Sequence, residues 1–212
     1  MKNLIIATKN NDKFKEMRAV FNHLPFEIVS LKQFPDLPDA VEDGKTFADN
    51  ALIKAKFFME LTGRACIADD SGLCVDALDG MPGVYSARFA VLDSTDDPNH
   101  AHDSNDNDNN RKLINELNRI GVEQSAAAYK CALCFIDVDG TIFQTEGVCK
   151  GTIKKIPRGT GGFGYDPYFY ISDGITMAEL SLEQKNKISH RGEALRKMVD
   201  ILTDWSEGKF RK

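Results

Sequence analysis

Two neighbouring aspartates, Asp69 and Asp70, follow the apolar run 65–68 and precede Ser71 and Gly72. We expect the run to form a short buried strand and the acids to lie in a tight loop at its end, at the edge of a sheet. Carboxylates in that position present hard oxygen ligands to Mg²⁺, and a second carboxylate can orient a lysine or a water molecule. Taken alone, a solvated turn or a helix cap explains the pair equally well.

A second acidic pair, Glu42 and Asp43, stands before a predicted helix that leads to this strand, and Lys54 and Lys56 lie on that helix. Acids that hold a cation and lysines that contact oxygen anions are the components of a phosphate-processing site. Residues 8–13 come directly off the first predicted strand and open a helix, so their backbone N–H groups suit a phosphate. They lack the glycine spacing of a P-loop, however, and a strand-to-helix turn needs polar residues in any case.

The glycine-rich stretch 159–164 opens onto aromatic residues. It does not match the dinucleotide-binding fingerprint, because no helix pattern follows it. Phe163 and Tyr165 are suited to lie flat on an aromatic base, and Asp166 can accept hydrogen bonds from ring nitrogens. His190 and Arg191 begin the last predicted helix, where a helix N-terminus, an imidazole and a guanidinium can donate to a carbonyl oxygen. A flexible loop and an ordinary helix start are the alternatives.

A competing motif lies in residues 135–141, which read F-I-D-V-D-G-T. The segment resembles the nucleophile motif of haloacid-dehalogenase-type phosphatases, in which the first aspartate, here Asp137, attacks phosphorus. That fold normally opens with the motif, whereas here it begins past the middle of the chain. Asp139 and Gly140 also suit a two-residue hairpin turn, which is the plainer interpretation.

The elements that must position these residues alternate between strands and helices. Thr46 with Asp49 resembles a capping box at the start of a helix that Gly63 would end, and residues 129–143 are typical of a hairpin. Of the 18 residues 93–110, 11 are Asp or Asn, which favours a solvated loop. We therefore expect a mixed α/β protein built on a mixed sheet.

Composition narrows the class of protein. The 212 residues are 42% hydrophobic and 28% charged, as in a folded soluble domain, and we expect one domain over residues 1–212. A net charge of −5 argues against a grip on a nucleic-acid polymer. No stretch approaches the roughly 20 apolar residues of a membrane span, and the apolar start is too short for a signal peptide, so we expect a cytoplasmic protein without membrane partners.

The five cysteines sit mostly in apolar runs and are expected to be reduced core thiols. Cys131 and Cys134 have C-x-x-C spacing, but in a strand their side chains would point to opposite faces, which disfavours a zinc or redox site.

Six segments together resemble one family, that of the inosine triphosphate pyrophosphatases, also called the dITP/XTP or non-standard purine nucleoside triphosphate pyrophosphatases. In chain order they are residues 8–13 with Glu16, E-D-G-x-T-F-x-x-N-A (42–51), A-D-D-S-G-L (68–73), P-G-x-Y-S-A-R (82–88), G-T-G-G-F-G-Y-D-P (159–167) and I-S-H-R-G (188–192). The resemblance spans almost the whole chain. One departure is Val41, which stands where many relatives have another acid before Glu42, and it leaves the second metal ligand open.

The resemblance implies an elongated two-lobed fold around a long mixed β-sheet with flanking helices, a nucleotide cleft between the lobes, and a homodimer. It implies Mg²⁺-dependent hydrolysis of ITP, dITP and XTP to the monophosphate and pyrophosphate. Glu42 and Asp70 would hold the metal, and Asp70 would accept the proton. The residues that would contact the purine nucleoside triphosphate are Thr8, Lys9, Asn10, Asn11, Asp12, Lys13, Lys54, Ser71, Phe163, Gly164, Tyr165, Asp166, Lys185, His190 and Arg191.

Overall fold

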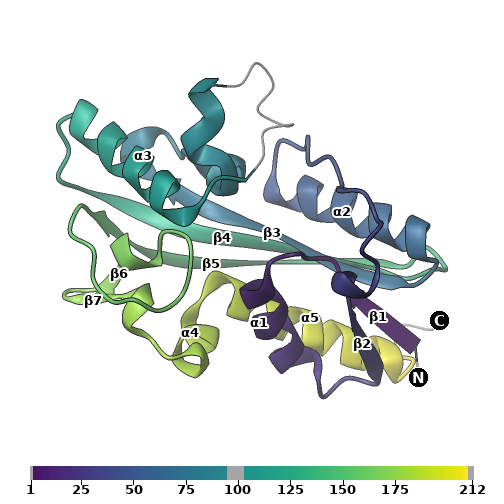
Figure 1. Cartoon of the computed structure of the whole chain (residues 1–212). Helices are drawn as coiled ribbons and strands as arrows, with labels where there is room; N and C mark the ends of the chain where they lie inside the picture. Colours follow the sequence, from purple (N-terminus) through teal and green to yellow (C-terminus); the bar gives the residue numbers. More distant parts are fainter. Residues whose placement is uncertain (1, 95–102, 210–212) are drawn as a thin grey trace. The chain divides into compact units, whose positions relative to one another are not determined.

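The computed structural model describes residues 2–94 and 103–209 (Figure 1). Its seven strands form one sheet in the order β2-β1-β3-β4-β5-β6-β7 within the described chain. The β1 strand pairs in parallel with β2 and β3, whereas β6 pairs antiparallel with β5 and β7. The prediction of an α/β protein with a mixed sheet is therefore confirmed.

The strands are β1 (Lys2–Ile6), β2 (Phe26–Ser30), β3 (Ala65–Val75), β4 (Gln124–Ile136), β5 (Ile142–Lys154), β6 (Phe169–Ser172) and β7 (Ile175–Thr176). The α-helices are α1 (Asn11–Phe21), α2 (Phe47–Thr62), α3 (Asp106–Arg119), α4 (Leu182–Ile188) and α5 (His190–Ser206). A longer 3₁₀ segment, η3, covers Gly83–Ser94. No helix in the described part of the chain is both long and apolar enough to cross a membrane.

The chain divides into two compact units, each with its own packing. Unit 1 comprises Met1–Asp70, Cys131–Gly147 and Arg191–Lys212, and unit 2 comprises Ser71–Lys130 and Val148–His190. The predicted single domain over residues 1–212 stays a prediction.

Unit 1 buries apolar side chains on both faces of its strands, because successive residues of a strand point to opposite faces. Leu4 and Ile6 of β1 pack with α1 and α5 residues such as Met17 and Leu195, whereas Ile5 packs with residues of α2. The helices accordingly lie on the two sides of the strands within this unit (Figure 1). Cys131 and Cys134 belong to the two different clusters, which confirms that the C-x-x-C side chains point apart.

Unit 2 has a third cluster, in which α3 and η3 contribute to the core. Leu113 and Leu117 of α3 are fully buried with Phe89 of η3, Tyr129 of β4 and Phe169 of β6.

Three sequence-based predictions of local structure are corrected. Asp69 and Asp70 lie inside β3 and not in a loop at its end, because β3 continues beyond residues 65–67, which pair with β1, and the long strand β4 is its neighbour on the other side. The segment 93–110 is not wholly a loop, since α3 begins at Asp106 within it; residues 95–102 lie outside the described chain. The hairpin connection is longer than two residues: the Asp137 amide donates to the Thr141 carbonyl at 2.9 Å.

Candidate active site

The helix α2 starts with a complete capping box. The Thr46 side chain accepts from the Asp49 amide at 3.1 Å, and the Asp49 carboxylate accepts from the Thr46 amide, also at 3.1 Å. Gly63 ends the helix in the left-handed conformation, with φ 62°. Both predicted signals are confirmed, and they fix the helix that carries Asn50 and Lys54 toward β3.

Asn50 joins the loop before α2 to the aspartate pair. Its Nδ2 donates to Asp70 Oδ2 at 2.9 Å, and its Oδ1 accepts from the Gly44 amide at 2.8 Å. A Cβ at position 44 would come within 2.6 Å of Asn50 Oδ1, so only glycine fits there. The E-D-G-x-T-F-x-x-N-A motif is thus a capped helix start whose asparagine orients the Asp70 carboxylate.

Asp69 is one of two anions in a buried charge cluster. Its Oδ2 lies 3.1 Å from Lys13 Nζ and 3.2 Å from Arg191 Nε, and Asp69 is 1% exposed. The Nη1 of Arg191 also bonds to the Glu16 carboxylate, which is equally buried. A cluster in which each charge meets an opposite one tolerates burial, whereas an isolated charge would not.

Lys54 connects the second acidic group to the first. Its Nζ lies 2.9 Å from Glu42 Oε1 and donates to the Asp69 carbonyl at 3.0 Å. Burial alone would lower the pKa of Lys54, but the negative charges of Glu42, Asp70 and Asp69 outweigh it and raise that pKa. The lysine therefore stays a cation beside the aspartate pair.

The pKa values of the two aspartates are shifted in opposite directions. Burial disfavours the charged form of Asp69, but Lys13, Arg191 and Lys54 outweigh that effect and hold its pKa well below the ordinary value. For Asp70, burial and the nearby Glu42 raise the pKa, although Lys54, Lys13 and the Asn50 hydrogen bond oppose the rise. The pKa values of the pair are thus pushed apart, which favours the ionised form of Asp69; the predicted role of Asp70 as proton acceptor stays a prediction.

The donor set near Asp70 fits a Mg²⁺ ion. Mg²⁺ is usually bound through one or two carboxylates, with waters and substrate phosphates completing its shell. Glu42 and Asp70 are close enough for the charge of Glu42 to raise the pKa of Asp70, a repulsion that a divalent cation relieves. Nowhere in residues 2–94 and 103–209 do three His, Cys, Asp or Glu side chains converge as a metal cage. Two carboxylates leave coordination positions of a Mg²⁺ ion that water and phosphate oxygens can fill.

The turn 8–13 lies at the end of β1 as predicted, but two of its backbone amides already donate hydrogen bonds to a side chain. Asn10 is the N-cap of α1, and its Oδ1 accepts from the amides of Asp12 and Lys13 at 2.9 and 3.1 Å. Lys9 and Asp39 form an exposed ion pair. These two amides therefore already have an acceptor, and Lys13 contributes its ammonium beside Asp69; the predicted contact of residues 8–13 with phosphate stays a prediction.

A second group of predicted residues meets in unit 2. Lys185 Nζ bonds to Asp166 Oδ2 at 2.9 Å with both side chains almost fully buried, and it lies 4.2 Å from the centre of the Phe163 ring. The Phe163 amide donates to the same Asp166 oxygen at 3.1 Å. A Cβ at Gly162 would come within 2.0 Å of that oxygen, which explains this glycine. Burial raises the pKa of Asp166, and Lys185 opposes the rise.

His190 lies against a residue that sequence reasoning missed. The imidazole stacks on the ring of Tyr129, with centroids 4.8 Å apart and planes at 11°. The ring centroids of Tyr129 and Phe169 are 4.5 Å apart. Burial raises the pKa of Tyr129, and the nearby Asp166 adds to the rise. In the sequence Tyr129 lies in a predicted apolar strand, and no local signal distinguishes it from a core residue.

Two predicted base contacts are placed differently from expectation. Tyr165 is 3% exposed in the core, and its hydroxyl donates to the Ser86 carbonyl at 2.8 Å, so its ring is not an open stacking surface. Arg191 pairs with Asp69 and Glu16 in unit 1; its predicted contact with a base stays a prediction. Ser71 is half-buried in β3, where unit 2 begins.

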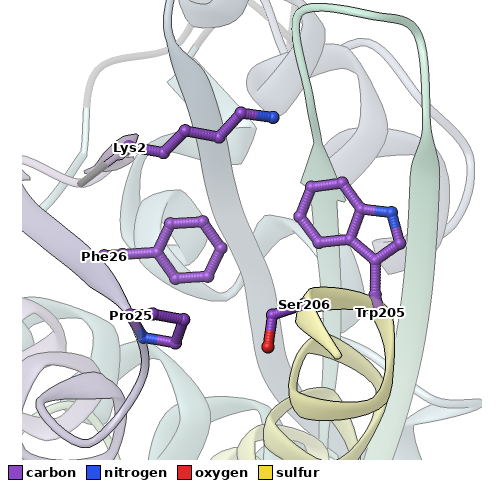
Figure 2. A pocket seen from close by; sticks show the side chains of 5 residues that line it. All are labelled: Lys2, Pro25, Phe26, Trp205 and Ser206. Atoms are coloured by element: carbon purple, nitrogen blue, oxygen red, sulfur yellow. The ribbon is translucent and has the colours of Figure 1, made fainter. Parts of the chain in front are cut away.

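A cavity in unit 1 contains none of the predicted site residues. It has a volume of about 230 Å³ and is lined by Lys2, Pro25, Phe26, Trp205 and Ser206, as Figure 2 shows. This is smaller than the roughly 300 Å³ at which small-molecule pockets begin. Lys2 Nζ lies 5.1 Å from the Trp205 ring centre and pairs with the buried carboxylate of Asp137. That carboxylate also accepts from the Val138 amide, so it serves the hairpin connection.

Comparison with known proteins agrees with the motifs. The model of the Ham1 family matches residues 4–201. A dITP/XTP pyrophosphatase of Geobacter sulfurreducens is 47% identical over 203 residues, covering 95% of this chain and 97% of that protein, and one of Geobacillus kaustophilus is 46% identical over 212 residues, covering 100% and 99%. A HAM1 protein from Coxiella burnetii has a similar structure, with a TM-score of 0.83 at 34% identity over 96% of this chain and 100% of that one. These matches confirm the resemblance, and the chain belongs to the Ham1 family.

Proposed function

We propose that this chain is a Mg²⁺-dependent pyrophosphatase that converts dITP, XTP and ITP to the monophosphate and pyrophosphate and so clears deaminated purines from the nucleotide pool. The observation that carries the proposal is the aspartate pair, in which Asp69 is held ionised by cations while the pKa of Asp70 is raised. The names of the relatives, dITP/XTP pyrophosphatase, support the same activity and substrates.

The proposed chemistry is a displacement at the α-phosphorus. A water molecule gives its proton to Asp70 and attacks phosphorus, and pyrophosphate leaves. Lys13 and Lys54 bind phosphate oxygens, and Asp69 keeps Lys13 in place through their ion pair. Mg²⁺, which Glu42 and Asp70 would hold, neutralises phosphate charge when it is bound.

Recognition of the base rests on the second group of residues. The Phe163 ring offers an aromatic face, and the cations and N–H groups of Lys185 and His190 favour the C6 carbonyl of hypoxanthine or xanthine. The C6 amino group of adenine would face donors instead of an acceptor, and such a mismatch costs about 1 to 3 kcal/mol when buried.

The test is product analysis by ion-exchange chromatography after incubation with ITP and Mg²⁺, with dITP, XTP, ATP and GTP in parallel. We expect IMP and pyrophosphate from ITP and little product from ATP or GTP. Asp70→Asn should abolish turnover without unfolding the protein, whereas Asp137→Asn should retain it. Appearance of IDP with free phosphate, or loss of activity only in Asp137→Asn, would contradict the proposal in favour of a phosphatase.

A catalytically silent nucleotide-binding module is the other alternative. It predicts binding of ITP without turnover in the presence of metal, which the same incubation together with calorimetry would detect.

The family resemblance also supports a homodimer in the cytoplasm, and light scattering coupled to size-exclusion chromatography measures the mass in solution.

A further inference from the structure

The residue Gly164 is held at both of its backbone polar groups by the first turns of α3. Its N–H donates to Asp106 Oδ2 at 2.7 Å, and its carbonyl accepts from Asn110 Nδ2 at 2.9 Å. Gly164 has φ 65°, a conformation that side-chain-bearing residues rarely adopt. Two side chains more than 50 positions away in the sequence thus fix one residue of the glycine-rich stretch.

Asp106 is not needed to cap the helix on which it lies. The N-cap of α3 is Asn105, whose Oδ1 accepts from the Asp108 amide at 2.9 Å, and the Asp108 carboxylate pairs with Arg111. Asn110 is 6% exposed, so its amide is committed to an interior contact. The contacts to Gly164 are therefore separate from the contacts that start the helix.

The helix is itself anchored to η3. Asn109 accepts from the Ala90 amide at 2.9 Å and donates to the Ala87 carbonyl at 3.0 Å. The same η3 accepts the Tyr165 hydroxyl at the Ser86 carbonyl. The P-G-x-Y-S-A-R motif has no role in the proposed chemistry. It contacts Tyr165 through Ser86, while α3 contacts Gly164 through Asp106 and Asn110.

The neighbours of this held segment are the base-binding residues. Phe163 precedes Gly164, and Asp166 follows one residue later, joined to Lys185 and to the Phe163 amide. A stretch with glycines at 159, 161, 162 and 164 has many backbone conformations open to it. Contacts that select one conformation before the ligand arrives remove an ordering cost that binding would otherwise bear.

We propose that Asp106 and Asn110 are positioning residues for the purine base: by fixing Gly164 they keep the Phe163 ring beside Lys185 in the arrangement that binds hypoxanthine or xanthine. This inference rests on the proposed function and adds residues that act on the base site through the backbone.

The test compares binding of IMP and of pyrophosphate by calorimetry, together with turnover of ITP. Asp106→Ala and Asn110→Ala should each weaken IMP binding and raise KM by about three- to tenfold, the range expected for one lost hydrogen bond. Binding of pyrophosphate, which has no base, should stay within twofold, and so should kcat. Asn110→Asp, which sets an acceptor against the Gly164 carbonyl, should weaken IMP binding more than Asn110→Ala.

Two variants serve as controls. Asp106→Asn keeps an acceptor for the Gly164 amide and should restore near-normal IMP binding. Asp108 lies in the same helix turn, and its carboxylate contacts Asn105 and Arg111. The Asp108→Ala variant should therefore bind IMP normally.

The inference is overturned if the Asp106 and Asn110 variants bind IMP normally, if pyrophosphate binding weakens by the same factor, or if Asp108→Ala matches Asp106→Ala. A failure of the proposed function looks different, because the wild-type protein then produces no pyrophosphate. The calorimetric series still decides the positioning role in that case, since IMP binding does not need turnover, and wild-type protein that binds no IMP overturns the positioning role.

Discussion

Asn50 holds the carboxylate of Asp70 from a separate element: its Nδ2 on α2 donates to Asp70 Oδ2 on β3 at 2.9 Å. The bond favours the ionised form of Asp70 and opposes the burial that raises the pKa of that group. The helix cap at Thr46 and the absence of a side chain at Gly44 both serve this contact.

Asn50→Asp should shift the acidic limb of the pH dependence of kcat/KM to higher pH. The new carboxylate replaces a donor with a negative charge, so the pKa of Asp70 rises and the deprotonated base is lost earlier as the pH falls. The measurement is a pH–rate profile at saturating Mg²⁺. Asp49→Asn, which keeps an acceptor for the Thr46 amide, should leave the limb in place, and an unchanged profile in Asn50→Asp would contradict the assignment of Asp70 as the base.

Asp69→Asn should destabilise the fold by about 3 to 5 kcal/mol, because it removes the buried carboxylate that Lys13 and Arg191 share and leaves Arg191 with Glu16 alone. The folded pKa of Asp69 lies below its ordinary value of 3.8, so its stabilising effect is present above that value and is lost as the pH falls through the folded pKa. Urea unfolding should show wild-type stability decreasing from about pH 4 downward, with a weaker decrease in the variant. Asp12→Asn, at an exposed position, is the matched control.

Lys185→Met should lower the free energy of unfolding by about 3 to 5 kcal/mol, because Asp166 then stays buried without its cation. Adding Asp166→Asn to that variant removes the uncompensated charge and should recover part of the loss. A double-mutant cycle by urea unfolding measures the coupling between the two side chains. Additive effects would show that the ion pair contributes nothing.

Thr46→Ala should destabilise the protein by about 1 kcal/mol through loss of the N-cap of α2, and Thr46→Ser should retain most of the stability. Thermal unfolding compares the three proteins. An Ala variant as stable as wild type would show that packing alone holds the helix.

In native protein, thiol reagents should modify Cys74 first. Burial raises the pKa of Cys134 to about 12 and moves the pKa of Cys66 and Cys131 in the same direction, whereas Cys74 is half-buried and its pKa is raised less by burial. Because the thiolate is the reactive form, the fast phase of modification should disappear in Cys74→Ser. Rapid modification of Cys134 at neutral pH would contradict this burial.

Local signals predicted local structure correctly. The capping box at Thr46, the glycine stop at Gly63 and the start of the last helix at His190 each depend on a few neighbouring residues, and each is found where the sequence places it. The opposite directions of Cys131 and Cys134 follow from strand alternation alone.

The predictions of local structure were wrong where contacts with residues distant in the sequence determine the conformation. Asp69 and Asp70 read as a loop, yet β3 continues through them beyond its pairing with β1, and β4 is its neighbour on the other side. The polar residues from Asp106 to Asn110 also read as a loop, because Asp and Asn favour turns, but here they start a helix and hold distant backbone. Asn50 and Glu16 stood in the quoted motifs without a role, and only the geometry shows what they hold.

Arg191 bonds to residues 122 and 175 positions earlier in the chain, Asp69 and Glu16. During synthesis both carboxylates emerge long before the guanidinium that neutralises them, and closing so long a segment is slow compared with forming a hairpin or a helix. The charge cluster of unit 1 can therefore be completed only after Arg191 has been synthesised. A chain that stops before residue 191 carries the buried acids Asp69 and Glu16 without this cation, so a prematurely terminated product should be less stable in unit 1.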